Sequence, residues 1–181
     1  MLLHLLRHTR PLIGSGICYG QSDIAVSETD CMQLAMDVQP QLNVGIPVFS
    51  SPLQRCAQLA RQFSDVPVFD ARLKELNFGN WEMQEWDHIP RAEIDAWALA
   101  QATYRPGGAE SAVEFAQRII LWLEDLRLQQ IPEALIVSHA GSMRMILAWE
   151  NGMQAQELAE KTCQRQQNFA FGEYVKYIVF R

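Results

Sequence analysis

The feature that most limits the fold is the alternation of short apolar runs with stretches patterned for helices. Residues 2–6 and 134–137 are such runs, and polar residues that include a histidine follow each of them. Runs of this length are typical of strands buried on both faces of a sheet. Residues 109–127 carry apolar side chains at helical spacing, which predicts a long helix. The alternation predicts an α/β fold with a mostly parallel sheet and helices on both faces, in three layers (α/β/α).

Turn residues and helical spacing predict the remaining elements. They are strands near 47–52 and 67–69, helices starting at Ser27 and after Pro52, two short helices broken at Pro90, a helix over 143–150, and a hairpin over 169–180 turning at Gly172-Glu173. The chain has 181 residues, 49% of them hydrophobic, and no stretch with the composition of a linker is seen. We therefore expect one domain over residues 1–181.

The charge balance restricts the partners. The formal net charge is -6, whereas nucleic-acid surfaces need clustered basic residues, so we expect no nucleic-acid partner. The only lysines are Lys74, Lys161 and Lys176, so nearly all positive charge is arginine, which is suited to fork-like contacts with phosphate. An acidic protein that binds an anion must gather those arginines locally.

We expect no bound metal, no cofactor and no membrane association. The cysteines are widely spaced without a Cys-x-x-Cys pair, which argues against structural zinc. His4 and His8 lie on a predicted strand, where their spacing lacks the helical geometry of zinc motifs. The first seven residues are too short for a signal peptide, and no run reaches the ~18 apolar residues of a membrane span. We expect a cytoplasmic protein.

Two histidines fall where ligands bind in this class of fold. His8 follows the first predicted strand, and His139 follows the strand at 134–137. Ligands of open α/β sheets bind outside the carboxyl ends of the strands. We therefore expect both histidines in one pocket.

Phosphoryl transfer requires a nucleophile, cationic donors around the phosphoryl oxygens, and a proton source for the leaving group. His8 is the candidate nucleophile, because a neutral imidazole is well populated at pH 7. Arg7 and Arg55 would supply planar donors, and a protonated His139 a further one. Glu75 is the candidate general acid for the leaving group and then general base for water.

Taken singly, each of these residues has a structural alternative. A histidine at a strand end is often only hydrogen-bonded within the fold, and Arg55 also fits an ordinary surface arginine. Glu75 also fits a solvated carboxylate or a partner of Lys74.

Four segments resemble, in order, the signature of the histidine phosphatase superfamily, also called phosphoglycerate-mutase-like. They are Leu6-Arg7-His8-Thr9, Ser50-Ser51-Pro52-Leu53-Gln54-Arg55, Leu73-Lys74-Glu75-Leu76-Asn77-Phe78-Gly79-Asn80-Trp81-Glu82 and Ser138-His139-Ala140-Gly141. The family patterns are Arg-His-Gly, Ser-Ser-Pro-x-x-Arg, Glu-x-x-x-Gly-x-Trp-Glu and Ser-His-Gly-Gly. Residues 81–91 and 106–111 are most similar to the α-ribazole phosphatase branch.

The resemblance implies a phosphoglycerate-mutase-like fold and a metal-independent hydrolase. It implies His8 as the phosphohistidine nucleophile and Glu75 as the proton donor. Arg7, Arg55 and His139 would form the phosphate pocket. The α-ribazole phosphatase branch removes the 5′-phosphate of α-ribazole phosphate during assembly of the cobalamin nucleotide loop, which makes that ester the first substrate implied.

The chain departs from the family pattern at three places. Thr9 replaces the glycine after the nucleophile, and its hydroxyl can bond a phosphate oxygen or its own loop. The asparagine usual in the loop after the first strand has no clear counterpart. Ala109 interrupts the usual Gly-Gly-Glu-Ser.

Three functions are compatible with these residues. The first is hydrolysis of a small-molecule phosphomonoester, and the second is phosphoryl transfer of the phosphoglycerate mutase type, whose enzymes are longer. The third is a phosphate-binding module without turnover, against which Glu75 argues because binding alone needs no proton donor. The oligomeric state and a lid over residues 82–106 stay open.

Overall fold

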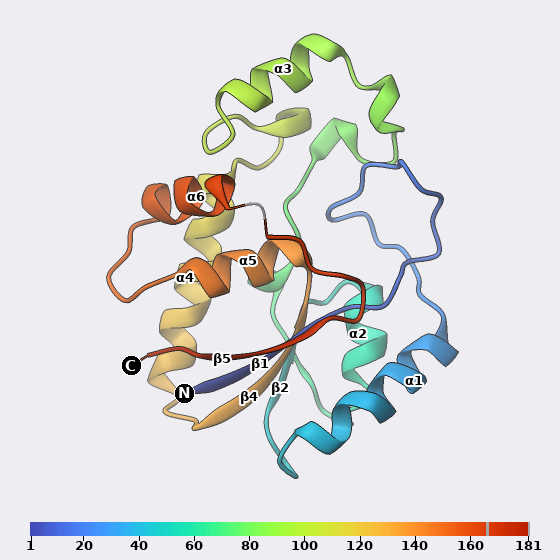
Figure 1. The fold of residues 1–181 in the computed structure, drawn as a ribbon, viewed down its shortest axis with the longest axis vertical. Coiled ribbons are helices and arrows are strands. Elements are labelled where there is room, and N and C mark those ends of the chain that lie inside the picture. Colours follow the sequence, from blue (N-terminus) through green and yellow to red (C-terminus); the bar gives the residue numbers. More distant parts are fainter. Residues whose placement is uncertain (166, 181) are drawn as a thin grey trace.

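The computed structural model describes residues 1–165 and 167–180, and its strands form one mixed sheet with the order β3-β2-β4-β1-β5 (Figure 1). They are β1 (Leu2–Arg7), β2 (Val48–Ser50), β3 (Val68–Phe69), β4 (Glu133–Ser138) and β5 (Tyr174–Ile178). The pairs β1–β4, β2–β4 and β2–β3 are parallel, and β5 is antiparallel to β1. The mostly parallel sheet predicted from the sequence is confirmed.

The predicted hairpin over 169–180 is wrong. The chain turns at residues 171–172, where Gly172 has φ 75°, but the residues before the turn form no strand within the described chain. β5 pairs with β1 instead, with Tyr174 opposite Leu6 and Ile178 opposite Leu2. An alternating pattern shows that a segment is extended but does not name its partner, and here the open edge of β1 is that partner.

Helices cover both faces of the sheet (Figure 1). They are α1 (Glu28–Val38), α2 (Gln54–Ala60), α3 (Arg91–Leu99), α4 (Ala112–Leu128), α5 (Ala140–Ala148) and α6 (Ala155–Gln164), with short 3-10 helices at Gln39–Gln41, Ala71–Leu73, Gly79–Trp81, Trp86–His88 and Pro106–Gly108. The helices α1 and α2 lie on one face, and α4, α5 and α6 lie on the other. The predicted three layers are therefore present.

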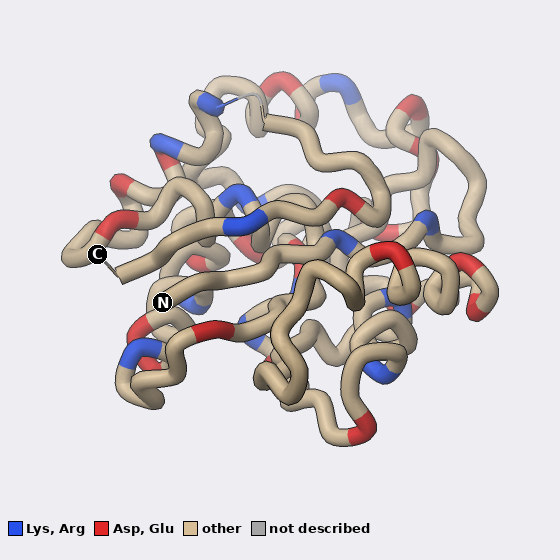
Figure 2. Tube along the Cα trace, turned by 60° about the horizontal axis from the view of Figure 1, so that its bottom comes forward, with Lys and Arg blue, Asp and Glu red and all other residues tan. Residues whose placement is uncertain are grey.

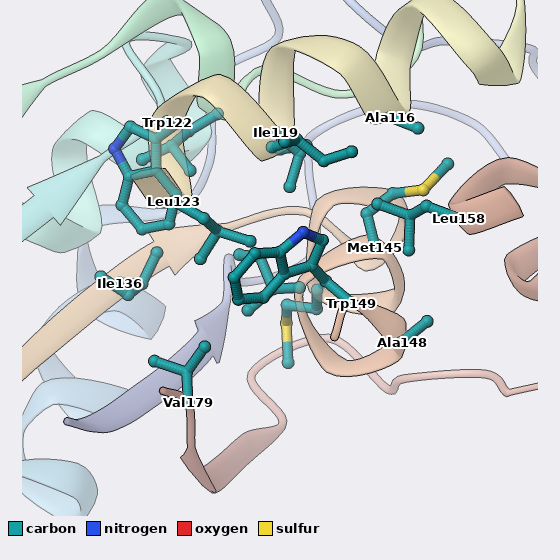
Figure 3. Close-up of a cluster of buried hydrophobic side chains, with 14 of the residues drawn as sticks. Ala116, Ile119, Trp122, Leu123, Ile136, Met145, Ala148, Trp149, Leu158 and Val179 are labelled. Carbon is teal, nitrogen blue, oxygen red and sulfur yellow. The ribbon is translucent and has the colours of Figure 1, made fainter. Parts of the chain in front are cut away.

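Neighbouring residues of β1 pack on opposite faces, as the pleat of a strand requires. Leu3 and Leu5 belong to the larger core cluster, under α4, α5 and α6, whereas Leu6 packs with Cys31 of α1 and Leu59 of α2. Figure 3 shows part of the larger cluster, in which helix residues gather over the sheet. Those labelled include Ile119 and Leu123 of α4, Ile136 of β4, Met145 of α5, Leu158 of α6, and Trp149.

An aromatic cluster lies beyond the sheet, around α3. It consists of Cys18, Phe78, Trp81, Trp86, Ile89, Ile94, Trp97 and Tyr104. Trp86 and Trp97 stack with ring centroids 6.2 Å apart, and Trp81 donates to Glu93 over 2.6 Å. The predicted break at Pro90 is confirmed, since the 3-10 helix ends at His88 and α3 begins at Arg91. This cluster fixes residues 78–104 as a packed unit.

Charged residues of both signs are interspersed along the trace in Figure 2. Among the described helices, none combines the length and the apolar composition that a bilayer crossing requires.

Candidate active site

The parallel pairing of β1 with β4 brings two histidines together at the carboxyl edge of the sheet. Arg7 lies opposite Ser138, and the His8 N–H donates to the Ser138 carbonyl over 3.2 Å. A histidine follows each of these two residues in the sequence. The ring centroids of His8 and His139 are 5.1 Å apart, with an angle of 64° between the ring planes. Strand register alone thus places these two predicted residues side by side.

Among the described residues, one ring nitrogen of His8 has a hydrogen-bond partner and the other has none. Its Nδ1 lies 2.7 Å from the Thr9 carbonyl oxygen, which can only accept, so Nδ1 carries the proton and Nε2 does not. The side chain is only 2% exposed. Burial, followed by the charge of Arg55, lowers the pKa of His8 to about 3. At neutral pH the imidazole is therefore uncharged, with a lone pair on Nε2.

Thr9 contributes through its backbone. Its carbonyl fixes the His8 tautomer, while its hydroxyl lies 3.5 Å from Cys31 Sγ in α1. The threonine that replaces the family's glycine is thus accommodated, with its hydroxyl in contact with its own surroundings.

His139 is fully buried at the start of α5. Its Nε2 is 2.8 Å from Ser51 Oγ and 3.4 Å from Cys56 Sγ. Burial, followed by the charge of Arg55, lowers the pKa of His139 well below the usual value. The protonated His139 expected from the sequence is therefore disfavoured before an anion binds, because the structure buries the ring among other cations. As a neutral ring it can still donate one hydrogen bond.

Besides burial, the charges of two arginines, Arg55 and Arg7, lower the pKa of both histidines. Arg55, fully buried in α2, donates through Nη1 to the Ser22 carbonyl over 2.8 Å and through Nη2 to the Gly20 carbonyl over 2.5 Å. Arg7 donates to the Phe169 carbonyl over 2.5 Å. The Nε atoms of both arginines are buried and have no partner among the described residues. Because unpaired buried donors are costly, an anion that accepts from them would relieve that cost.

Glu75 is held by the backbone next to His139. Its Oε2 accepts from Gly141 N over 2.9 Å and its Oε1 from Leu76 N over 3.0 Å. A Cβ on Gly141 would lie 2.0 Å from Glu75 Oε1, so a larger residue there would displace the Glu75 carboxylate. Burial lowers the pKa of Arg7, and the charges of Tyr19 and Glu75 oppose that shift.

Sequence reasoning missed the residues that hold Glu75 in place. Arg118 of α4 donates to three carbonyls of this segment, those of Arg72 over 2.6 Å, Lys74 over 2.7 Å and Glu75 over 2.9 Å. An arginine in an amphipathic helix is usually interpreted as solvent-facing, so no local signal distinguishes Arg118.

Glu82 ties the same segment to the loop after β1. It accepts from the backbone N–H groups of Gln21 over 2.8 Å, Ser22 over 2.5 Å and Phe78 over 3.1 Å. The sequence signal that could have identified Glu82 as a functional residue was its place in the family-like motif Trp81-Glu82. Glu82 thus joins the segment carrying Glu75 to the loop whose carbonyls hold Arg55.

The buried neutral histidines predict a pH-dependent stability. The pKa of His8 is lower in the folded chain (about 3) than its ordinary 6.5, so the unfolded chain binds more protons between these pH values. Unfolding free energy should therefore fall on acidification through this window, by about 2 kcal/mol between pH 7 and 5 from His8 alone. Urea titrations at both pH values measure the unfolding free energy. In His8→Ala its change between the two pH values should be smaller by that amount. An unchanged slope in the variant would contradict a neutral buried His8.

Comparisons with known proteins show the family to which the chain is related. A model of the histidine phosphatase superfamily (branch 1) matches residues 3–168. The chain is 27% identical over 165 residues to "Putative phosphoserine phosphatase 2" of Hydrogenobacter thermophilus, covering 86% of this chain and 81% of that protein. It is 31% identical over 164 residues to "Probable phosphoglycerate mutase GpmB" of Erwinia tasmaniensis, covering 84% and 76%.

A solved structure adds the fold. The alpha-ribazole phosphatase from Shigella flexneri matches with a TM-score of 0.74 at 26% identity, covering 88% of this chain and 84% of that chain. The resemblance inferred from the four motifs is confirmed by the family match and by this structure together. The chain belongs to the histidine phosphatase superfamily.

Proposed function

We propose that the protein hydrolyses phosphomonoesters through a phosphohistidine formed at Nε2 of His8. The observation that carries the proposal is the state of this ring, which is neutral, held by the Thr9 carbonyl at Nδ1, and free at Nε2. A nucleophile in that state needs no base to activate it. Nε2 forms a bond to phosphorus while the bond from phosphorus to the ester oxygen breaks.

Glu75 gives its proton to the departing oxygen in the first step. In the second step it takes a proton from water, whose oxygen attacks the phosphohistidine and releases phosphate and a regenerated His8. Its backbone bonds to Gly141 and Leu76 support this role, because they hold the carboxyl group next to His139.

Arg7, Arg55 and His139 bind the phosphoryl oxygens. The free Nε donors of the two arginines support this, because charge that builds on those oxygens is best stabilised by donors already in place. The carbonyl partners of Arg55 fix its guanidinium before substrate arrives. The site needs no metal in this mechanism, since the cationic charge comes from arginine.

The first substrate to test is α-ribazole 5′-phosphate, in assembly of the cobalamin nucleotide loop. The similarity of residues 81–91 and 106–111 to that branch supports it, together with the Shigella flexneri structure. The mutase alternative rests on the relative from Erwinia tasmaniensis.

A screen of small phosphomonoesters tests the proposal. It compares kcat/KM for α-ribazole 5′-phosphate, phosphoserine, phosphoglycerates and nucleotides, with and without a strong chelator. We expect phosphate release, highest for one of the first two esters and unaffected by the chelator. Faster interconversion of phosphoglycerates than phosphate release would favour the mutase, and loss of turnover with the chelator would contradict the metal-independent mechanism.

A further inference from the structure

The loop between β1 and α1 is anchored on both sides of Tyr19. Cys18 exchanges two backbone hydrogen bonds with residues 83–84, each of 2.8 Å. Gly20 lies so close to Leu76 that an added Cβ would be 1.8 Å from the Leu76 carbonyl oxygen. The backbone of Tyr19 is therefore fixed between the aromatic cluster and the residue that follows Glu75.

The Tyr19 side chain faces the charged groups of the candidate active site. Its ring centroid is 5.5 Å from Cζ of Arg55. The half-buried phenol interacts with the charges of Arg7, Arg55, Glu75 and Arg10, and those of Arg7 and Arg55 are the strongest. Charged groups from three separate segments therefore act on the pKa of this phenol.

The hydroxyl of Tyr19 has a proton to donate and no hydrogen-bond partner among the described residues. Within residues 1–165 and 167–180, Tyr174 and Tyr177 form hydrogen bonds through their hydroxyls, whereas Tyr19 and Tyr104 do not. Burial raises the pKa of Tyr19 despite the neighbouring arginines, so the phenol stays protonated at neutral pH.

We propose that Tyr19 is a further phosphoryl-binding residue, whose hydroxyl donates a hydrogen bond to a nonbridging oxygen of the group bound beside Arg7 and Arg55. The inference rests on the proposed phosphomonoesterase function. It also accounts for a departure from the family pattern, because Tyr19 supplies a neutral donor from the loop in which the usual asparagine has no counterpart. Only a hydrogen bond forms, and no proton is transferred from the phenol.

Tyr19→Phe tests the proposal because it removes the hydroxyl and keeps the ring. The matched control is Tyr104→Phe, which removes a hydroxyl from the aromatic cluster. With an aryl phosphate, we expect kcat/KM of Tyr19→Phe to fall by about 10- to 100-fold, mostly in kcat, since the donor acts where charge builds. The control should stay within about twofold of the wild type.

Vanadate and inorganic phosphate separate a binding role from a structural one. Vanadate resembles the five-coordinate transition state, whereas phosphate resembles the product, and both can be titrated without turnover. We expect Tyr19→Phe to weaken the binding of vanadate by about the factor lost in kcat. The binding of phosphate should weaken by clearly less. The melting temperature should stay that of the wild type.

Three outcomes would overturn the proposal. They are an unchanged vanadate affinity, equal weakening of vanadate and phosphate with a lower melting temperature, and an equal loss in Tyr104→Phe. If the wild type turned over no ester, the proposed function would fail, while the vanadate and phosphate titrations would still decide whether Tyr19 binds an oxyanion.

Discussion

The His8→Ala variant is expected to lose hydrolysis of an aryl phosphate by at least about a thousandfold, because it lacks the Nε2 atom on which the proposed covalent intermediate forms. The loss should appear in kcat/KM, measured by phenol release. The wild type, quenched in base during turnover, should carry a phosphoryl group on His8, since phosphohistidine survives base and hydrolyses in acid. The variant should carry none.

His88→Ala is the matched control for this experiment. His88 is exposed in the 3-10 helix at Trp86–His88, with 73% of its side chain accessible, and lies outside the site. We expect it to retain wild-type activity. Turnover close to the wild type in His8→Ala, or a phosphoenzyme formed by that variant, would remove His8 from the mechanism.

The position of the two histidines was predictable because it depends on local pattern and a general rule of topology. The run at 2–6 and the run at 134–137 indicated buried strands without reference to any partner. Parallel strands end at the same edge, so residues that follow them meet there. The register of β1 with β4 then fixes the 5.1 Å separation of the His8 and His139 rings.

The chemical state of the site was less predictable, because it depends on burial that no local pattern reveals. His139 was expected to be protonated, yet full burial beside Arg55 lowers its pKa. The same environment leaves His8 neutral, which favours attack. Cationic donors packed this closely disfavour a charged imidazole and favour the binding of an anion.

The residues that hold Glu75 in place, and the position of Tyr19, could not be predicted for a different reason. Arg118 binds carbonyls more than forty positions earlier in the sequence, and Tyr19 faces residues drawn from several segments. Such contacts exist only once distant segments meet. The misassigned tail has the same origin, since β5 pairs with β1 at the other end of the chain.

Glu75→Gln should separate the two steps of the proposed reaction. The substitution keeps the shape and one acceptor oxygen for Gly141 or Leu76, but the amide can neither give nor take the required proton. With an alkyl phosphate, whose leaving oxygen needs a proton, kcat/KM should fall by about 10²- to 10⁴-fold. With p-nitrophenyl phosphate the loss in kcat/KM should be much smaller, because the phenolate leaves unaided.

The second step should remain slow with either ester, because water attack still requires a base. With p-nitrophenyl phosphate, Glu75→Gln should therefore show a burst of p-nitrophenol followed by slow turnover, while phosphohistidine accumulates at His8. Glu85→Gln, which changes an exposed carboxylate next to the 3-10 helix at Trp86–His88, is the control and should show neither effect. Equal losses with the two esters and no burst would mean that another group supplies the proton. If Glu75 serves both steps, its replacement must make the rate depend on the leaving group.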